Sequence, residues 1–188
     1  MKLIEIARAQ LLTSVRLFFE DKDPISTHTL AGAASEILEY LCISQGEKPF
    51  RTYAKDANPN LTDKEYSKIA NLFKNAFKHV GDTDKRRQMH QIATKNFDDT
   101  QNDALLYTCI FDYMLANKKM PIEFQVFQAW FCQAHPDKVS EDFSNLPSPL
   151  AFNNLSMLSR YMQKQVAIEV INELRKNEAL IDSQKTER

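Results

Sequence analysis

The sequence is poor in the residues that break helices and in the patterns that bind metals or phosphates. It has only three glycines in 188 residues, Gly32, Gly46 and Gly81, and they stand alone, so no glycine-rich loop can cradle a phosphate. The three cysteines are too far apart for a zinc knuckle or a CxxC pair, and no histidine pair has metal-ligand spacing. The longest apolar run, residues 105–111, is far shorter than the roughly 18 residues of a membrane span. We therefore expect no metal, no cofactor and no membrane-spanning segment.

The near-neutral charge conceals a basic segment. The formal net charge is −1, but residues 48–95 hold eleven Lys/Arg against five Asp/Glu, a formal charge of +6, which leaves −7 on the remainder. Such a segment can bind a polyanion, or it can be a solvated face that pairs with acidic neighbours or with a second subunit. The odd number of cysteines, each in an apolar context, and the lack of an apolar region at the N-terminus predict a cytoplasmic protein.

Helix-start signals and apolar periodicity predict an all-α fold. We expect a single-domain helical bundle of about six helices over residues 1–182, followed by a flexible tail at residues 183–188. Asp23-Pro24 is a typical helix start, and Thr62 with Glu65 makes a capping box. The predicted helices span residues 2–20, 24–44, 62–81, 98–118, 121–134 and 153–180, with loops at residues 47–60 and 82–96. Small residues in "LAGAAS" (residues 30–35) would let a neighbouring helix approach closely.

The predicted helix at residues 62–81 separates into two faces when its residues are placed at about 100° intervals. One face is apolar and should contact the core; it consists of Tyr66, Ile69, Ala70, Phe73, Ala76, Phe77 and Val80. The opposite face is polar and basic, and it consists of Lys64, Lys68, Asn71, Asn75 and Lys78. Lys74 and His79 flank Asn75 on either side, so the three should belong to the solvated side of this helix.

The stretch "KNAFKH" (residues 74–79) is similar to the signature of HEPN domains, an all-α family named for higher-eukaryote and prokaryote nucleotide binding. The family motif is an arginine, commonly followed by a polar residue, with a histidine four to six residues beyond the arginine. Carried over by position, Lys74 stands in place of the arginine, Asn75 is the polar residue and His79 is the histidine. The resemblance implies metal-independent RNA cleavage in a cleft between two protomers. Lysine keeps the charge of arginine but loses its planar, two-pronged contact with phosphate.

A second resemblance covers more of the chain. Residues 6–38, together with "KNAFKH", resemble small uncharacterised bacterial proteins of about this length, which implies a bacterial origin and supplies no activity. Within this stretch, His28 lies on a polar helix face. It is either a histidine hydrogen-bonded at a helix interface or part of a polar cluster with Asn75 and His79, oriented by Asp112.

These observations predict one of two functions. The first is a HEPN-like RNA-acting or nucleotide-binding homodimer, with weakened or intact RNA cleavage. Its catalytic residues would be His79, Lys74 and Asn75, and its binding residues Lys64, Lys68, Asn71, Lys78 and His28. The second is a homodimeric, non-catalytic protein–protein interaction module whose basic face binds an acidic partner.

Overall fold

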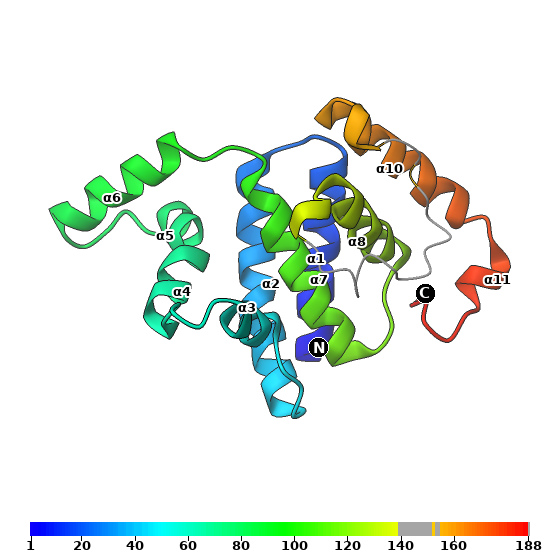
Figure 1. Ribbon diagram of the computed structural model, residues 1–188, viewed down its shortest axis with the longest axis horizontal. Coiled ribbons are helices and arrows are strands. Elements are labelled where there is room, and N and C mark those ends of the chain that lie inside the picture. Colours follow the sequence, from blue (N-terminus) through cyan, green and yellow to red (C-terminus); the bar gives the residue numbers. More distant parts are fainter. Residues whose placement is uncertain (139–151, 153–154, 188) are drawn as a thin grey trace.

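The computed structural model describes residues 1–138, 152 and 155–187, and it confirms the all-α fold (Figure 1). The described residues form ten α-helices, not about six, with two short 3-10 helices and no β-strand. The α-helices are α1 (Leu3–Phe19), α2 (Pro24–Ser44), α3 (Phe50–Ala57), α4 (Asp63–Ala70), α5 (Leu72–Lys78), α6 (Asp84–Lys95), α7 (Gln101–Asn117), α8 (Ile122–Ala134), α10 (Arg160–Leu174) and α11 (Glu178–Ile181). The 3-10 helices are η1 (Pro136–Lys138) and η2 (Leu155–Met157).

The core lies where α1, α2, α7 and α8 meet, at the centre of Figure 1. Leu11, Leu38 and Ile110 are completely buried there. Beside them Phe18 packs edge-on against Trp130, with ring centroids 5.2 Å apart, the arrangement that aromatic pairs prefer. This core fixes the central helices, while α4, α5 and α6 extend to one side and α10 and α11 to the other.

Helix starts that depend on adjacent residues were predicted correctly. The Asp23 carboxylate accepts hydrogen bonds from the backbone N–H groups of Ile25 and Ser26, at 3.1 Å each, and Pro24 occupies the first helical position. Thr62 and Glu65 form the predicted capping box. Because each of these contacts lies within three residues, the sequence alone specifies it.

Four predicted elements differ from the structure. Residues 47–60 were predicted as a loop but contain α3, and residues 82–96 were predicted as a loop but contain α6. The predicted helix at residues 62–81 is broken at Asn71, whose ψ of 2° is not helical and which ends α4 and begins α5. The predicted last helix also differs, since its start at residue 153 lies outside the described residues and α10 begins at Arg160. The break at Asn71 matters most, because it interrupts the predicted amphipathic helix just before the stretch at residues 74–79.

The C-terminal residues, for which we expected a flexible tail from residue 183, are bound to the helical core. Met120 forms a backbone bridge with Thr186, and its N–H donates to the carbonyl oxygen of Lys185 at 3.0 Å. The Glu187 carboxylate accepts hydrogen bonds from the Tyr113 hydroxyl and the Asn117 amide, at 2.5 and 3.1 Å. Residues 183–187 thus close over the turn between α7 and α8.

The cysteines are unpaired, and the described helices are short or polar. All three cysteines are free thiols, and Cys42 and Cys109 are buried. Within the described part of the chain, the helices are all too short or too polar to cross a membrane.

Candidate functional site

Lys74, the cation of the HEPN-like motif, is buried rather than solvated as the sequence predicted. Its side chain is 7% exposed, and its Nζ lies 2.5 Å from Oε1 of Glu36 on α2. Its methylene stem crosses α2 at Gly32, where an added Cβ would lie only 2.9 Å from Lys74 Cδ. Lys74 lies about 100° around the helix from Phe73, at the edge of the predicted apolar face, and the absence of a side chain at Gly32 leaves room there for its stem. The small residues of α2 predicted that a neighbouring helix approaches closely. At Gly32 the group that approaches is the methylene stem of Lys74.

Asn75 and His79, the other two motif residues, are exposed. His79 ends α5, and its carbonyl oxygen accepts a hydrogen bond from Nδ1 of His90 on α6 at 2.8 Å. The structure therefore does not bring the three motif side chains together within one protomer. Lys74 is directed into the contact between α2 and α5, while Asn75 and His79 face solvent.

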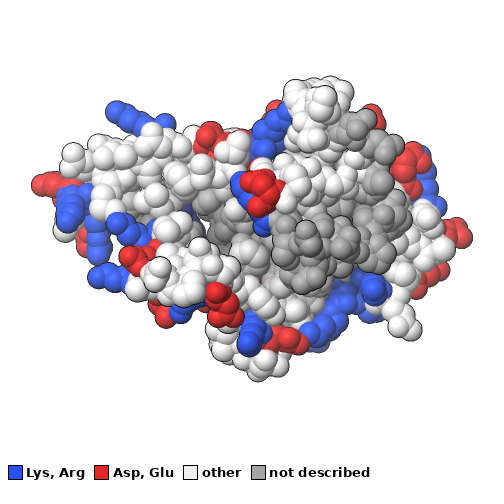
Figure 2. All heavy atoms as spheres, viewed as in Figure 1, with Lys and Arg blue, Asp and Glu red and all other residues white. Residues whose placement is uncertain are grey.

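The predicted binding lysines are distributed over the outside of the α4–α6 lobe (residues 63–95). Lys64, Lys68 and Lys78 are exposed and form no ion pair within the described residues, whereas Asn71 is half-buried at the helix break. The lobe holds eight Lys/Arg against four Asp/Glu, a formal charge of +4. Figure 2 shows basic side chains gathered on its left side, over α4–α6. Arg86 and Arg87 are neutralised locally by Asp82 and Asp84, so the unpaired charge comes mainly from lysines.

The apolar face predicted for residues 62–81 is only partly buried. Phe73 and Phe77 point inward, but Ile69 is 68% exposed and Val80 is 83% exposed. Ile92 of α6 is 54% exposed as well. These aliphatic side chains lie in the same basic lobe as the unpaired lysines.

His28, like Lys74, is a buried member of the predicted set. Its Nδ1 lies 3.0 Å from Oδ1 of Asn102 on α7, and the Asn102 amide donates to the carbonyl oxygen of Pro24 at 3.1 Å. The rings of Phe73, Phe77 and Phe97 stand edge-on to the imidazole, with centroids 5.7, 5.7 and 5.3 Å away. Burial lowers the pKa of His28, an effect that the Asn102 contact opposes and the nearby Lys74 charge reinforces. Of its two sequence interpretations, the hydrogen-bonded histidine at a helix interface is the one that these contacts describe.

Asp112, the acid that we expected to orient His28, binds elsewhere. Its Oδ1 accepts a 2.6 Å hydrogen bond from the backbone N–H of Phe50, the first residue of α3. Burial raises the pKa of Asp112 to about 7. This carboxyl group therefore caps α3 from α7, and Asn102 takes the orienting role at His28.

A buried ion-pair network that sequence analysis missed joins α7, α8 and α10. The three nitrogens of the Arg160 guanidinium donate to Asp99 and Asp103, and the two shortest bonds are 2.6 Å. Asp103 also contacts His135 Nε2 at 2.9 Å, and Lys164, only 1% exposed, reaches Asp99 at 2.6 Å. Because every nitrogen of Arg160 is engaged, the network joins helices and presents no free cation to a ligand. Its one sequence signal is an arginine and a lysine four apart, Arg160 and Lys164, on a helix face that continues with Ala167 and Ile171.

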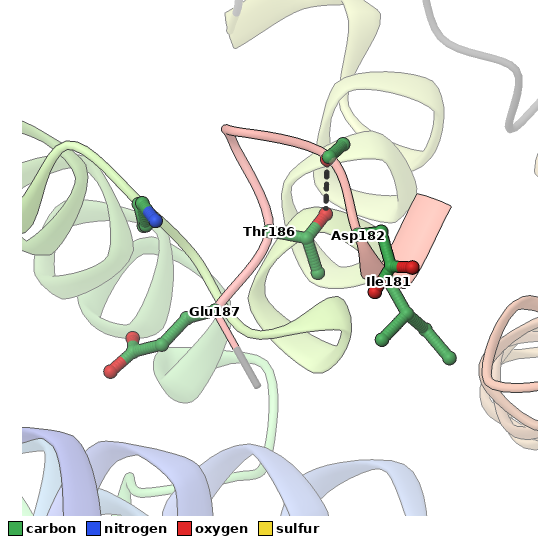
Figure 3. A pocket seen from close by; sticks show the side chains of 6 residues that line it. Ile181, Asp182, Thr186 and Glu187 are labelled. Atoms are coloured by element: carbon green, nitrogen blue, oxygen red, sulfur yellow. Dashed lines mark hydrogen bonds between the residues drawn. The ribbon is translucent and has the colours of Figure 1, made fainter. Parts of the chain in front are cut away.

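The structure also contains surface pockets away from the motif. One, of about 400 Å³, lies under the C-terminal segment (Figure 3) and is lined by Lys119, Ile181, Asp182, Ser183, Thr186 and Glu187. A second, of about 380 Å³, lies between α1, α8 and α10, where Arg16 and Arg175 both donate to the buried carboxylate of Glu123. Neither pocket includes a residue of the HEPN-like motif.

No protein-family model, curated protein or solved structure matches this chain. The described residues also contain no group of three or more His, Cys, Asp or Glu side chains that could hold a metal ion.

Proposed function

We propose that this chain is a non-catalytic interaction module whose α4–α6 lobe binds an acidic surface of a partner protein. The observation that carries this proposal is the set of exposed lysines without ion-pair partners in the described structure, Lys64, Lys68 and Lys78. Cations that are unpaired and close together raise the local potential, which steers an acidic partner and fixes its orientation.

The composition of the lobe surface favours a protein over RNA as the partner. Recognition of single-stranded RNA commonly uses exposed aromatic rings on which bases stack. Here Phe73, Phe77 and Phe97 are instead turned inward around His28. Exposed aliphatic side chains such as Ile69 and Ile92 accompany the lysines, and a mixture of apolar and basic groups suits a protein interface.

RNA cleavage by a HEPN-like site stays a prediction, with less support from the geometry. A general base and a fixed cation have to reach the same phosphodiester. Lys74 is held by Glu36 in a buried pair, so cleavage would require another cation or the breaking of that pair. Assembly into a homodimer likewise stays a prediction.

A charge-reversal experiment tests the proposal. The probe is a fluorescent peptide of alternating Asp and Ser residues, and its binding is followed by fluorescence anisotropy at about 0.05 M salt. Lys64→Glu/Lys68→Glu should weaken binding by about tenfold, since each reversed surface charge contributes roughly 0.5–1 kcal/mol. The matched control is Lys22→Glu/Lys119→Glu, which makes the same charge change at exposed lysines outside the lobe and should have a much smaller effect.

The same proteins distinguish the alternatives. Equal loss of binding in the two double variants would refute a specific basic face, because only the net charge would then matter. Cleavage of a single-stranded RNA that survives a chelator and disappears in His79→Ala would favour the enzyme over the interaction module. His79→Ala should leave peptide binding unchanged.

A further inference from the structure

His28 lies at the place where the α4–α6 lobe is attached to the core. It is 4% exposed and belongs to α2, its hydrogen-bond partner Asn102 belongs to α7, and the rings of Phe73 and Phe77 belong to α5. Phe97, from the segment between α6 and α7, closes the remaining side. The imidazole therefore contacts α5 of the lobe, the segment that joins the lobe to α7, and α7 itself.

The hydrogen-bond network fixes which nitrogen of His28 carries the proton. Asn102 donates its amide to the Pro24 carbonyl oxygen, so its own carbonyl oxygen faces His28. That oxygen can only accept, and Nδ1 of His28 must therefore be the donor. Nε2 is left as an unprotonated acceptor, and it is buried without a hydrogen-bond partner. A basic nitrogen is thus sealed between phenylalanine rings.

The charged groups around His28 give no compensation for a positive imidazole. From α5 the nearest charge is the Lys74 ammonium, which repels it, and Glu36 of α2 is already paired with that ammonium. On the α7 side, Asp103 is bound to Arg160 and His135, and Asp99 is bound to Arg160 and Lys164. Asp98, next to Phe97, accepts a hydrogen bond from the Thr100 backbone. A second proton on His28 would therefore be buried in an apolar site beside a like charge.

We propose that His28 is a proton-sensitive latch: protonation of its Nε2 releases α5, and with it the α4–α6 lobe, from α2 and α7. Opening would expose the imidazole to water, where the charged form is stable. It would also separate the imidazole from Lys74. The neutral form is compatible with the closed lobe because its single donor is satisfied by Asn102.

The direction of the pH dependence follows from the two states of the lobe. In the closed state, burial holds the pKa of His28 below its ordinary value of 6.5, while in the open state the group regains that value. The stability of the closed state is then complete above pH 6.5 and is lost as the pH falls through it. Each further pH unit lowers the closing equilibrium by up to about tenfold, until the pKa of the closed state is reached.

Amide hydrogen exchange of the full chain tests this inference. Protection of α5 and α6, corrected for intrinsic exchange rates, should fall by about fivefold between pH 6.5 and pH 5.5, because an open-state pKa of 6.5 weakens closing by factors of about 2 and about 11 at these two pH values. In His28→Gln, which keeps a donor for Asn102 but cannot take a second proton, protection of α5 and α6 should not show this fall. The control is His90→Gln in the same lobe, which removes a different imidazole and should retain the wild-type pH dependence.

Two outcomes would overturn the latch. One is protection of α5 and α6 that does not change with pH in the wild type, and the other is an unchanged pH dependence in His28→Gln. If His28→Gln does not fold, NMR titration of the wild-type imidazole decides the question, since a pKa at or above 6.5 in the folded chain contradicts the proposal. None of these measurements needs a partner, so the latch can be right even if the acidic-partner proposal fails, and the reverse also holds.

Discussion

The substitution Arg160→Met should destabilise the fold strongly, because it removes both charged bonds from a buried carboxylate. Asp103 has a side chain that is only 3% exposed, and it accepts from Arg160 at 2.6 Å on Oδ1 and at 2.9 Å on Oδ2. The Arg160 guanidinium also lies over the Phe18 ring, 5.3 Å from its centroid, so methionine removes this cation–π contact as well and the loss is mainly electrostatic. Breaking a buried pair on one side costs roughly 3–5 kcal/mol, and we expect about 3 kcal/mol because the His135 contact remains.

Urea unfolding followed by circular dichroism measures this loss. With an m-value of about 2 kcal/mol/M, the midpoint should fall by about 1.5 M. The matched control is Arg16→Met, which removes one guanidinium from Glu123 but leaves Arg175 on the same oxygen at 2.5 Å. We expect less than about 1 kcal/mol for that control.

The reasoning fails if Arg160→Met and Arg16→Met have the same midpoint, or if Arg160→Met lies within about 1 kcal/mol of the wild type. A double variant provides a second test. Adding Asp103→Asn to Arg160→Met removes the unpaired buried charge and should recover about 1 kcal/mol or more. A further loss of stability in the double variant would contradict an electrostatic cause.

Two other substitutions test how the segment from α3 to α6 is attached. Gly32→Ala should raise amide exchange in α5 by about tenfold, because the new Cβ would meet a Lys74 stem whose end is held by Glu36, and adding Lys74→Ala should remove the effect. Asp112→Asn should become more stable than the wild type as the pH rises. The raised pKa of Asp112, about 7, means that its stabilising contribution is present at low pH and is lost as the pH rises through 7, whereas asparagine still accepts from Phe50. Urea midpoints that differ equally at pH 6 and pH 8 would contradict this.

Helices were predicted from sequence where their signals are local and missed where they are not. The starts at Pro24 and Asp63 are specified by caps within three residues. The first N–H of α3 is instead capped by Asp112, which lies 62 residues further along the chain. No residue pattern near Phe50 predicts this cap. α6 was missed for another reason, since it buries only Ala93 and has no apolar stripe, although Thr83, whose hydroxyl accepts from Arg86 N–H, is a start signal that could have been recognised.

The sequence predicted that the residues of the candidate site are mostly basic, but it did not predict how their side chains are arranged in space. The exposed lysines Lys64, Lys68 and Lys78 were placed correctly, because their helices present them to solvent whatever their neighbours are. Lys74 was placed on the wrong side, because the helical wheel assigned it to solvent by its polarity, whereas Gly32 accommodates its stem and Glu36 accepts its ammonium on α2. Both partners belong to another helix, so the wheel of one helix does not include them.

The sequence by itself determined the all-α class, the caps that start α2 and α4, and a basic segment. Tertiary structure decided which polar groups are neutralised and which stay free to act. Lys74 meets Glu36 across 38 residues, Asp103 meets Arg160 across 57, and His28 meets Asn102 across 74. The physical reason is that a buried charge is stabilised only by the groups that contact it. Helix packing, rather than position along the chain, determines which groups those are.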